Sequence, residues 1–203
     1  MAGGRRPRGR PDRPGPEHVR QARACGFDAR AGDARRLGAA DGSVDVCLLL
    51  GPLYHLPEPS DRAAALAEAV RVTRAGGLVA AAAISRYAWP LYRLRDGHSL
   101  DDTTNLVRTL ATGRHDAADG FTTAYCHRPA ELTAELAAAG LEDVEVFGVE
   151  GPGWPLLAPS LAAERVEALV TECLAAARLY DGYPDMAGAS AHLLAHGRVT
   201  EGV

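Results

Sequence analysis

Tyrosine and histidine stand side by side in Gly51-Pro52-Leu53-Tyr54-His55, a polar segment that directly follows an apolar run. Both side chain types serve as general acids or bases in enzymes. We therefore consider Tyr54 and His55 as candidate catalytic residues that shape a pocket or take a proton from a substrate. For His55 the alternative is a loop histidine that only makes hydrogen bonds.

A second candidate is the acidic turn Gly32-Asp33-Ala34, which follows a short alternating segment. A carboxylate accepts hydrogen bonds from amino groups, so Asp33 is suited to bind a donor on a ligand. The same side chain commonly caps its own backbone in a turn. The sequence leaves both roles open.

A third group of candidates comes from residues 86–120, a segment rich in aromatic and polar residues with weak helical periodicity, and from positions after it. Aromatic side chains beside a few polar groups suit a small organic ligand. For the tryptophans the alternative is packing of a cap, and for the histidine it is a loop position at a helix start. The candidate substrate-binding residues are Arg86, Tyr87, Trp89, His127 and Trp154.

Hydrophobic periodicity predicts the elements that must position these residues. Residues 44–50 and 78–84 are apolar on nearly every position, as expected of central parallel strands that are covered on both faces. Residues 60–73 are amphipathic and form the crossover helix of a βαβ unit. A Gly-Gly turn is expected at its end. Gly51 then lies at the carboxyl end of the first strand, which is the edge where ligands bind in open α/β sheets.

The remaining periodic segments extend this α/β fold. A strand over 144–149 is expected to pair antiparallel with the last strand, over 191–199. Residues 86–120 are expected to form a lid of short helices. Other predicted segments are helices over 17–24, 128–139 and 160–180 and a short strand over 27–31.

Composition narrows the function classes. The 203 residues are enough for one domain with a sizeable core, expected over 17–203, after an Arg/Pro-rich tail over 1–16 that is expected to be disordered. The net charge of -4 does not favour binding of nucleic acid, and no apolar run is long enough to span a membrane.

The sequence contains no lysine, which excludes Schiff-base chemistry. Four separated cysteines predict neither a disulfide nor a metal site, and we expect a cytoplasmic protein.

The order of the motifs resembles the class I S-adenosylmethionine-dependent methyltransferases, in particular a small-molecule branch. An acidic residue follows a short strand, a buried strand ends in Gly-Pro-Leu-Tyr-His-Leu, and a helix ending in Arg-Ala-Gly-Gly precedes another buried strand. The resemblance implies a doubly wound, Rossmann-like, mostly parallel sheet and transfer of a methyl group to a small molecule. It also implies S-adenosylmethionine as cofactor, with its adenine at Gly32, Asp33 and Ala34 and its methionine half at Gly51, Pro52 and Leu53.

The resemblance fails at the start of the chain. The first strand and Gly-rich loop of the family are not visible, and Arg13, next to Asp12, occupies the position where the family usually has an acidic residue. We therefore expect an N-terminally truncated member with impaired cofactor binding. Strand 44–50 would then have an apolar edge without a neighbouring strand, and a second copy of the chain in a homo-oligomer would cover this edge. The alternative is a non-catalytic remnant or a partner subunit.

Overall fold

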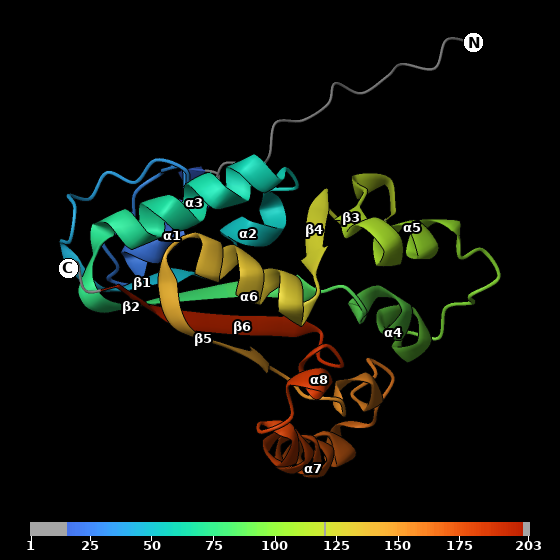
Figure 1. Ribbon diagram of the computed structural model, residues 1–203. Coiled ribbons are helices and arrows are strands. Elements are labelled where there is room, and N and C mark those ends of the chain that lie inside the picture. The colour runs from blue at the N-terminus through green and yellow to red at the C-terminus, as the bar shows by residue number, and fades with distance from the viewer. Residues whose placement is uncertain (1–15, 120, 201–203) are drawn as a thin grey trace.

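A six-stranded sheet runs through the computed structural model, which describes residues 16–119 and 121–200 (Figure 1). All but the last residue of the predicted disordered tail, and also Asp12 and Arg13, lie outside the described residues. The strands are β1 (Val44–Leu49), β2 (Thr73–Ser85), β3 (Arg114–His115), β4 (Ala124–His127), β5 (Leu141–Gly148) and β6 (His192–Val199).

The strand β2 organises the sheet. The strands follow the order β3-β4-β2-β6-β5, and β1 also pairs with β2. The β2 pairings with β1 and β4 are parallel, whereas β6 lies antiparallel between β2 and β5. The strand β6 occupies one edge of β2. The other edge is shared by β1 and β4, and β4 pairs with the end of β2 at Ile84 and Ser85. The predicted antiparallel pairing of the last two strands is therefore confirmed.

Helices flank the sheet and extend from its carboxyl edge. Proline occupies the first turn of α3 and of α6, where its missing N–H is tolerated. The bounds are α1 (Pro16–Ala24), α2 (Pro52–His55), α3 (Pro59–Val72), α4 (Ala88–Arg95), α5 (Thr104–Thr112), α6 (Pro129–Ala138), α7 (Ala163–Tyr180) and α8 (Pro184–Ala187).

The main core lies between the sheet and the helices α3 and α6, which cover the same face of it (Figure 1). Apolar side chains at helical spacing on α3 and α6 meet alternate residues of the strands, as amphipathic packing requires. The largest fully buried members of this core are Leu53, Leu66, Leu132, Leu136, Leu193 and Val79.

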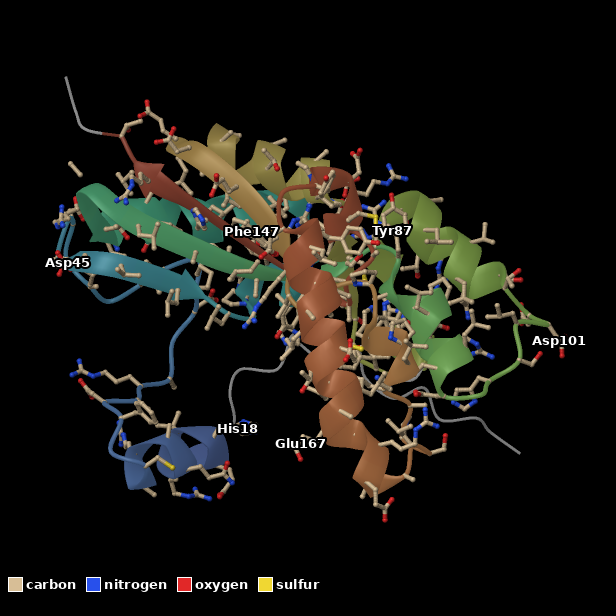
Figure 2. All side chains as sticks on the ribbon, turned by 90° about the horizontal axis from the view of Figure 1, so that it is seen from below. His18, Asp45, Tyr87, Asp101, Phe147 and Glu167 are labelled. Carbon is tan, nitrogen blue, oxygen red and sulfur yellow. The ribbon has the colours of Figure 1, made fainter. Side chains whose placement is uncertain are left out.

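The opposite face of β1 is exposed. Val46, Leu48 and Leu50 have exposed fractions of 49%, 59% and 60%. The prediction that this strand is covered on both faces is therefore wrong. In Figure 2 the sheet is seen from this side, with Asp45 on β1 in view.

Two local predictions also need correction. Residues 27–31 contain no strand, because five alternating residues without a paired neighbour are too few to fix one. The Gly-Gly pair follows α3, which stops at Val72, but it falls within the bounds of β2, at an irregularity where the pairing with β1 jumps from Thr73 to Leu78. A Cβ on Gly77 would lie 2.8 Å from the carbonyl oxygen of Asp45, so glycine is needed there for the close approach of β1.

The predicted helical lid over residues 86–120 contains α4, α5, β3 and a 3-10 turn at Ala117–Asp119. It projects beyond the carboxyl ends of β1 and β2 (Figure 1), and Asp101 marks its outer loop in Figure 2. None of the helices among the described residues is long and apolar enough to cross a bilayer.

Candidate functional site

The carboxyl end of β1 carries the first pair of candidates. Leu49 pairs with Ala81 of β2, and the chain then enters α2 through Gly51. The buried side chain of Leu53 anchors α2 in the core. This anchor holds Tyr54 and His55 at the edge, with ring centroids 4.6 Å apart. Tyr54 is partly buried and His55 is exposed.

The acidic turn is tied to the start of α3. The Oδ1 atom of Asp33 accepts a hydrogen bond from the backbone N–H of Arg35 at 3.0 Å. The Arg35 guanidinium lies 2.7 Å from Asp33 and 2.9 Å from Asp61 of α3. The hydrogen bonds that Arg35 donates to these two carboxylates raise its pKa. The backbone-capping role of Asp33 is therefore present in the structure, and its contact with adenine stays a prediction.

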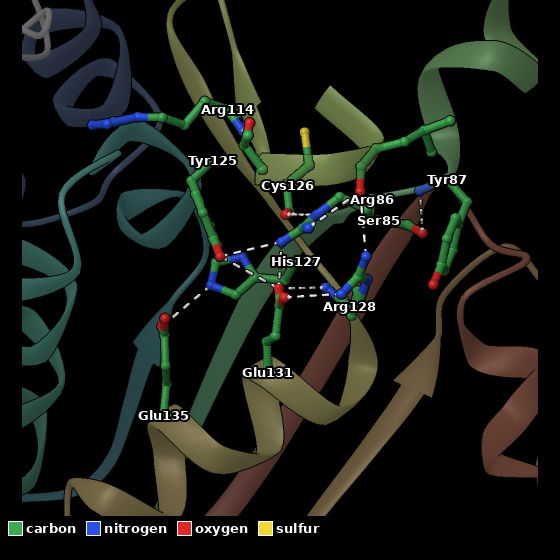
Figure 3. A network of polar contacts seen from close by, with 12 residues as sticks. Ser85, Arg86, Tyr87, Arg114, Tyr125, Cys126, His127, Arg128, Glu131 and Glu135 are labelled. Carbon is green, nitrogen blue, oxygen red and sulfur yellow. Dashed lines mark hydrogen bonds and ion pairs between the residues drawn. The ribbon is translucent and has the colours of Figure 1, made fainter. Parts of the chain in front are cut away.

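A buried polar network joins α3, α6 and β4, and Figure 3 shows its part around Arg86, His127 and the glutamates of α6. Arg62 donates to both carboxylate oxygens of Glu135 and to the carbonyl oxygens of Leu56 and Pro57. The Nε2 atom of His127 lies 3.2 Å from Glu135. Burial opposes the ionisation of Glu135, but the hydrogen bonds from His127 and Arg62 outweigh it and hold its pKa at about 2. These charges neutralise one another inside the protein.

The same network continues through Arg86, which is fully buried. Its Nε donates to the carbonyl oxygen of Cys126 at 2.7 Å, and its terminal nitrogen binds Tyr125 and Glu131. Glu131 also accepts a hydrogen bond from the backbone N–H of Arg128, which caps the start of α6. The network therefore fixes the beginning of the lid relative to β4 and α6.

The predicted substrate-binding residues occupy three environments. Arg86 and His127 lie in the buried network, where protein groups bind Arg86 and the Nε2 of His127. Trp154 is buried and donates to the carbonyl oxygen of Ala189, whereas Tyr87 is exposed. Trp89 is partly buried and lines a cavity in the lid. Packing therefore accounts for Trp154, and the substrate contacts of all five residues stay predictions.

A small apolar cluster connects the edge to the lid. Ile84, Ala88 and Cys126 belong to it, and Tyr54 of α2 packs against it together with Trp89 and Tyr92 of α4. The Nε1 atom of Trp89 donates to the sulfur of Cys126 at 3.3 Å. The candidate residues after β1 and the aromatic residues of the lid are thus joined by direct packing.

Two cavities lie near these elements. A cavity of about 540 Å³ lies in the lid between α4 and α5. A larger one, of about 870 Å³, is bounded by α6, β5, α7 and α8. The larger cavity contains Tyr87 but none of the other predicted site residues. The lid cavity shares Trp89 and Tyr92 with the cluster against which Tyr54 packs, whereas the larger cavity has no residue of that cluster in its wall.

Several important side chains escaped prediction from the sequence. Arg62 and Glu135 are 73 residues apart, and no local motif connects them. Asp96, Asn105 and Asp119 line the lid cavity but lie in segments without clear periodicity. Across the described ranges the cysteines are free and no cluster of histidine, cysteine or acidic residues is arranged to hold a metal ion.

The described residues fit part of an S-adenosylmethionine site. The backbone N–H of Ala34 has no hydrogen-bond partner within the described ranges, so it is available to an adenine nitrogen. Gly51, which is partly exposed after the end of β1, would lie beside the methionine half. Residues that would hold the ribose are expected near Asp12, outside the described residues.

Comparison with known proteins supports this interpretation. A methyltransferase domain family matches residues 14–81, whereas no curated protein sequence matches the chain. Among solved structures, a methyltransferase of Thermotoga maritima, described as a possible histamine N-methyltransferase, has a TM-score of 0.56 at 16% identity, covering 91% of this chain and 70% of that one. A putative methyltransferase of Haloferax volcanii, solved with the Trm112 methyltransferase activator, has a TM-score of 0.53 at 19% identity, with 93% and 69% covered.

A methyltransferase of Methanosarcina mazei has a TM-score of 0.51 at 17% identity, covering 92% of this chain and 79% of that one. These likenesses confirm the predicted Rossmann-like α/β fold class. The domain match covers β1, α3 and most of β2, the unit from which the resemblance was inferred. Residues 14–81 therefore resemble a methyltransferase domain, and the chain shares the fold of these solved methyltransferases.

Proposed function

We propose that this chain transfers the methyl group of S-adenosylmethionine to a small-molecule acceptor at the carboxyl edge of β1 and β2. The observation that carries this proposal is the shared apolar cluster, against which Tyr54 packs beside the lid residues Trp89 and Tyr92. A cofactor at Gly51 and an acceptor under the lid would then meet beside Tyr54.

Such a reaction demands little from side chains. A sulfonium methyl is already an electrophile, so alignment of the two reactants and exclusion of water supply much of the acceleration. Tyr54 and His55 are proposed to line the methyl-transfer position. A proton acceptor is needed there only when the acceptor atom carries a proton, which is the role we propose for His55.

Calorimetric titration with S-adenosylhomocysteine tests the cofactor site. Binding is expected and should weaken in Asp33→Ala, because Arg35 then loses the partner that orders the turn. Asp28→Ala is the matched control, since Asp28 is an exposed aspartate that pairs with Arg30 before the turn. Absence of heat at millimolar ligand would reject cofactor binding by this chain.

The alternative is a non-catalytic remnant or a partner subunit, and the open side of β1 favours association with another chain. Within the described residues β1 pairs only with β2, and Val46, Leu48 and Leu50 are exposed beside its free edge. Unpaired strand edges with apolar side chains are templates for association. Light scattering after gel filtration measures the assembly state, and Leu48→Arg should shift any oligomer toward monomer. A wild-type monomer at all concentrations would reject pairing between copies.

A further inference from the structure

The lid contains a cavity whose wall is chemically distinctive. Its volume of about 540 Å³ lies within the range of small-molecule sites, roughly 300–1,000 Å³. The wall combines aromatic rings with several carboxylates and one arginine. Its members include Trp89 and Tyr92 of α4, Asn105 of α5, His115 of β3, and Asp96, Asp102 and Asp119.

The carboxylates of the wall keep acceptor capacity. Asp119 has a side chain only 14% exposed and binds Asn105 and Arg108. Asp96 pairs with Arg95, while Asp102 accepts the backbone N–H of Thr104. An ionised carboxylate offers about four lone-pair positions, so these contacts leave room for a ligand donor.

The positive charges are placed less favourably for a ligand. Arg95 and Arg108 do not line the cavity. Arg93 does, but its guanidinium donates two hydrogen bonds to the carbonyl oxygen of Ser99. The wall itself therefore offers more acceptors than donors, which favours a ligand that carries N–H groups.

A second, independent observation comes from His115. This residue is 4% exposed, and its ring stacks on Trp89 with centroids 4.0 Å apart. Within the described ranges its Nε2 atom has no hydrogen-bond partner. Burial lowers the pKa of His115, which keeps the ring neutral. A buried polar atom without a partner is destabilising, so a polar group at this wall would be stabilising.

We propose that this cavity binds the methyl acceptor and that the acceptor is an organic amine. Its nitrogen lies among the carboxylates and near His115, and its apolar body lies against Trp89 and Tyr92. This inference rests on the proposed function for the identity of the ligand as acceptor. In the reaction, the bound ammonium first loses a proton to His55, the proton acceptor proposed above, and the freed lone pair forms the new N–C bond while the S–C bond breaks. Sulfur keeps the bonding pair, and the product is the methylated ammonium.

Direct binding without cofactor tests the inference separately from methyl transfer. The probes are phenethylamine, phenethyl alcohol and 3-phenylpropionate, which share an aromatic body and differ in the polar group. Calorimetry gives the affinity, and quenching of Trp89 fluorescence reports contact with the wall. Trp89→Phe removes this fluorescence signal and leaves that of Trp154. We expect phenethylamine to bind about tenfold more tightly than the alcohol, with the acid weakest.

Paired variants locate the site. Asp119→Asn should weaken phenethylamine binding about tenfold, whereas Asp116→Asn changes an exposed aspartate of the same turn outside the wall and should leave it unchanged. His115→Phe keeps a ring beside Trp89 but removes both nitrogens and should also weaken binding. Circular dichroism verifies that each variant is folded. Comparison of the three probes on the wild-type protein tests the inference without any substitution.

Equal binding of the three probes, tighter binding of the acid, or no binding of phenethylamine would overturn the inference. So would equal losses in Asp119→Asn and Asp116→Asn. Titration with S-adenosylhomocysteine remains a separate measurement. Cofactor binding without amine binding would reject the acceptor class and retain the proposed function, whereas amine binding without cofactor binding would reject methyl transfer.

Discussion

The buried network around Arg62 and the cavity in the lid use similar polar residues in opposite ways. In the network, Arg62 and Glu135 bind each other, and Arg86 binds Glu131, Tyr125 and a backbone carbonyl. In the cavity, the carboxylates keep unused acceptor positions and the Nε2 atom of His115 is unpaired, whereas in the network the Nδ1 atom of His127 is also unpaired among the described residues but the charged groups bind one another. Polar groups that satisfy one another hold a structure together, and polar groups with spare capacity are able to bind a ligand.

The largest expected effect comes from breaking the network. Glu135→Ala should lower the free energy of unfolding by about 3–5 kcal/mol, because it leaves the buried Arg62 charge without its carboxylate. Urea denaturation measures the loss. Glu142→Ala, an exposed glutamate of β5, is the control and should change stability by less than about 0.5 kcal/mol. A small loss in Glu135→Ala would show that the network is not structural.

Two neighbouring leucines on β1 provide a second contrast. Leu49→Ala should cost about 2–5 kcal/mol because Leu49 is buried in the main core. Leu48→Ala should cost less than about 0.5 kcal/mol in a monomer because Leu48 is 59% exposed. Thermal and urea unfolding at low protein concentration measure both. A comparable loss in Leu48→Ala would indicate that this face is covered in solution.

Acid should weaken the protein through its buried carboxylates. The pKa of Glu135 is about 2 against an ordinary 4.5, and Glu150, bound by His192 and Ser190 despite burial, is also held at about 2. Because both values are depressed, their stabilisation is present above about pH 5 and is lost as the pH falls toward 2. Each contributes at most about 3 kcal/mol, reduced by solvent screening at the partly exposed oxygens.

Urea unfolding between pH 7 and about 2 follows this loss, with the ionic strength held constant. Glu135→Gln should flatten the acid limb, since that side chain no longer titrates. An equally steep limb in this variant would assign acid sensitivity to other carboxylates.

The smallest stability effect is expected in the cavity. Asp119→Asn should change the free energy of unfolding by less than about 1 kcal/mol, because its arginine partner is half exposed and the amide keeps one acceptor. The substitution should reduce amine binding far more than stability, the reverse of Glu135→Ala. Urea unfolding and calorimetric titration of both variants test this contrast. A loss of several kcal/mol in the free energy of unfolding of Asp119→Asn would contradict it.

The βαβ unit was predictable because periodicity and the motif after β1 agree over forty residues. The Gly-Gly pair was misplaced because its signal is a close approach of β1, which a local pattern does not distinguish from a turn. The strand β4 was missed since its four residues owe their conformation to pairing with β2. The position of Tyr54 and His55 after β1 was predictable from the motif. The cavity wall was not, because it combines residues of α4, α5 and β3, and no sequence spacing indicates how these elements pack.

Hydrogen exchange with and without S-adenosylhomocysteine tests most directly where the cofactor binds. Bound ligand should slow amide exchange at residues 32–34 and 51–55, at the carboxyl edge of the sheet. Exchange at residues 177–188, beside the larger cavity, should stay unchanged. Protection confined to residues 177–188, or no protection at millimolar ligand, would contradict the placement of the cofactor at the end of β1.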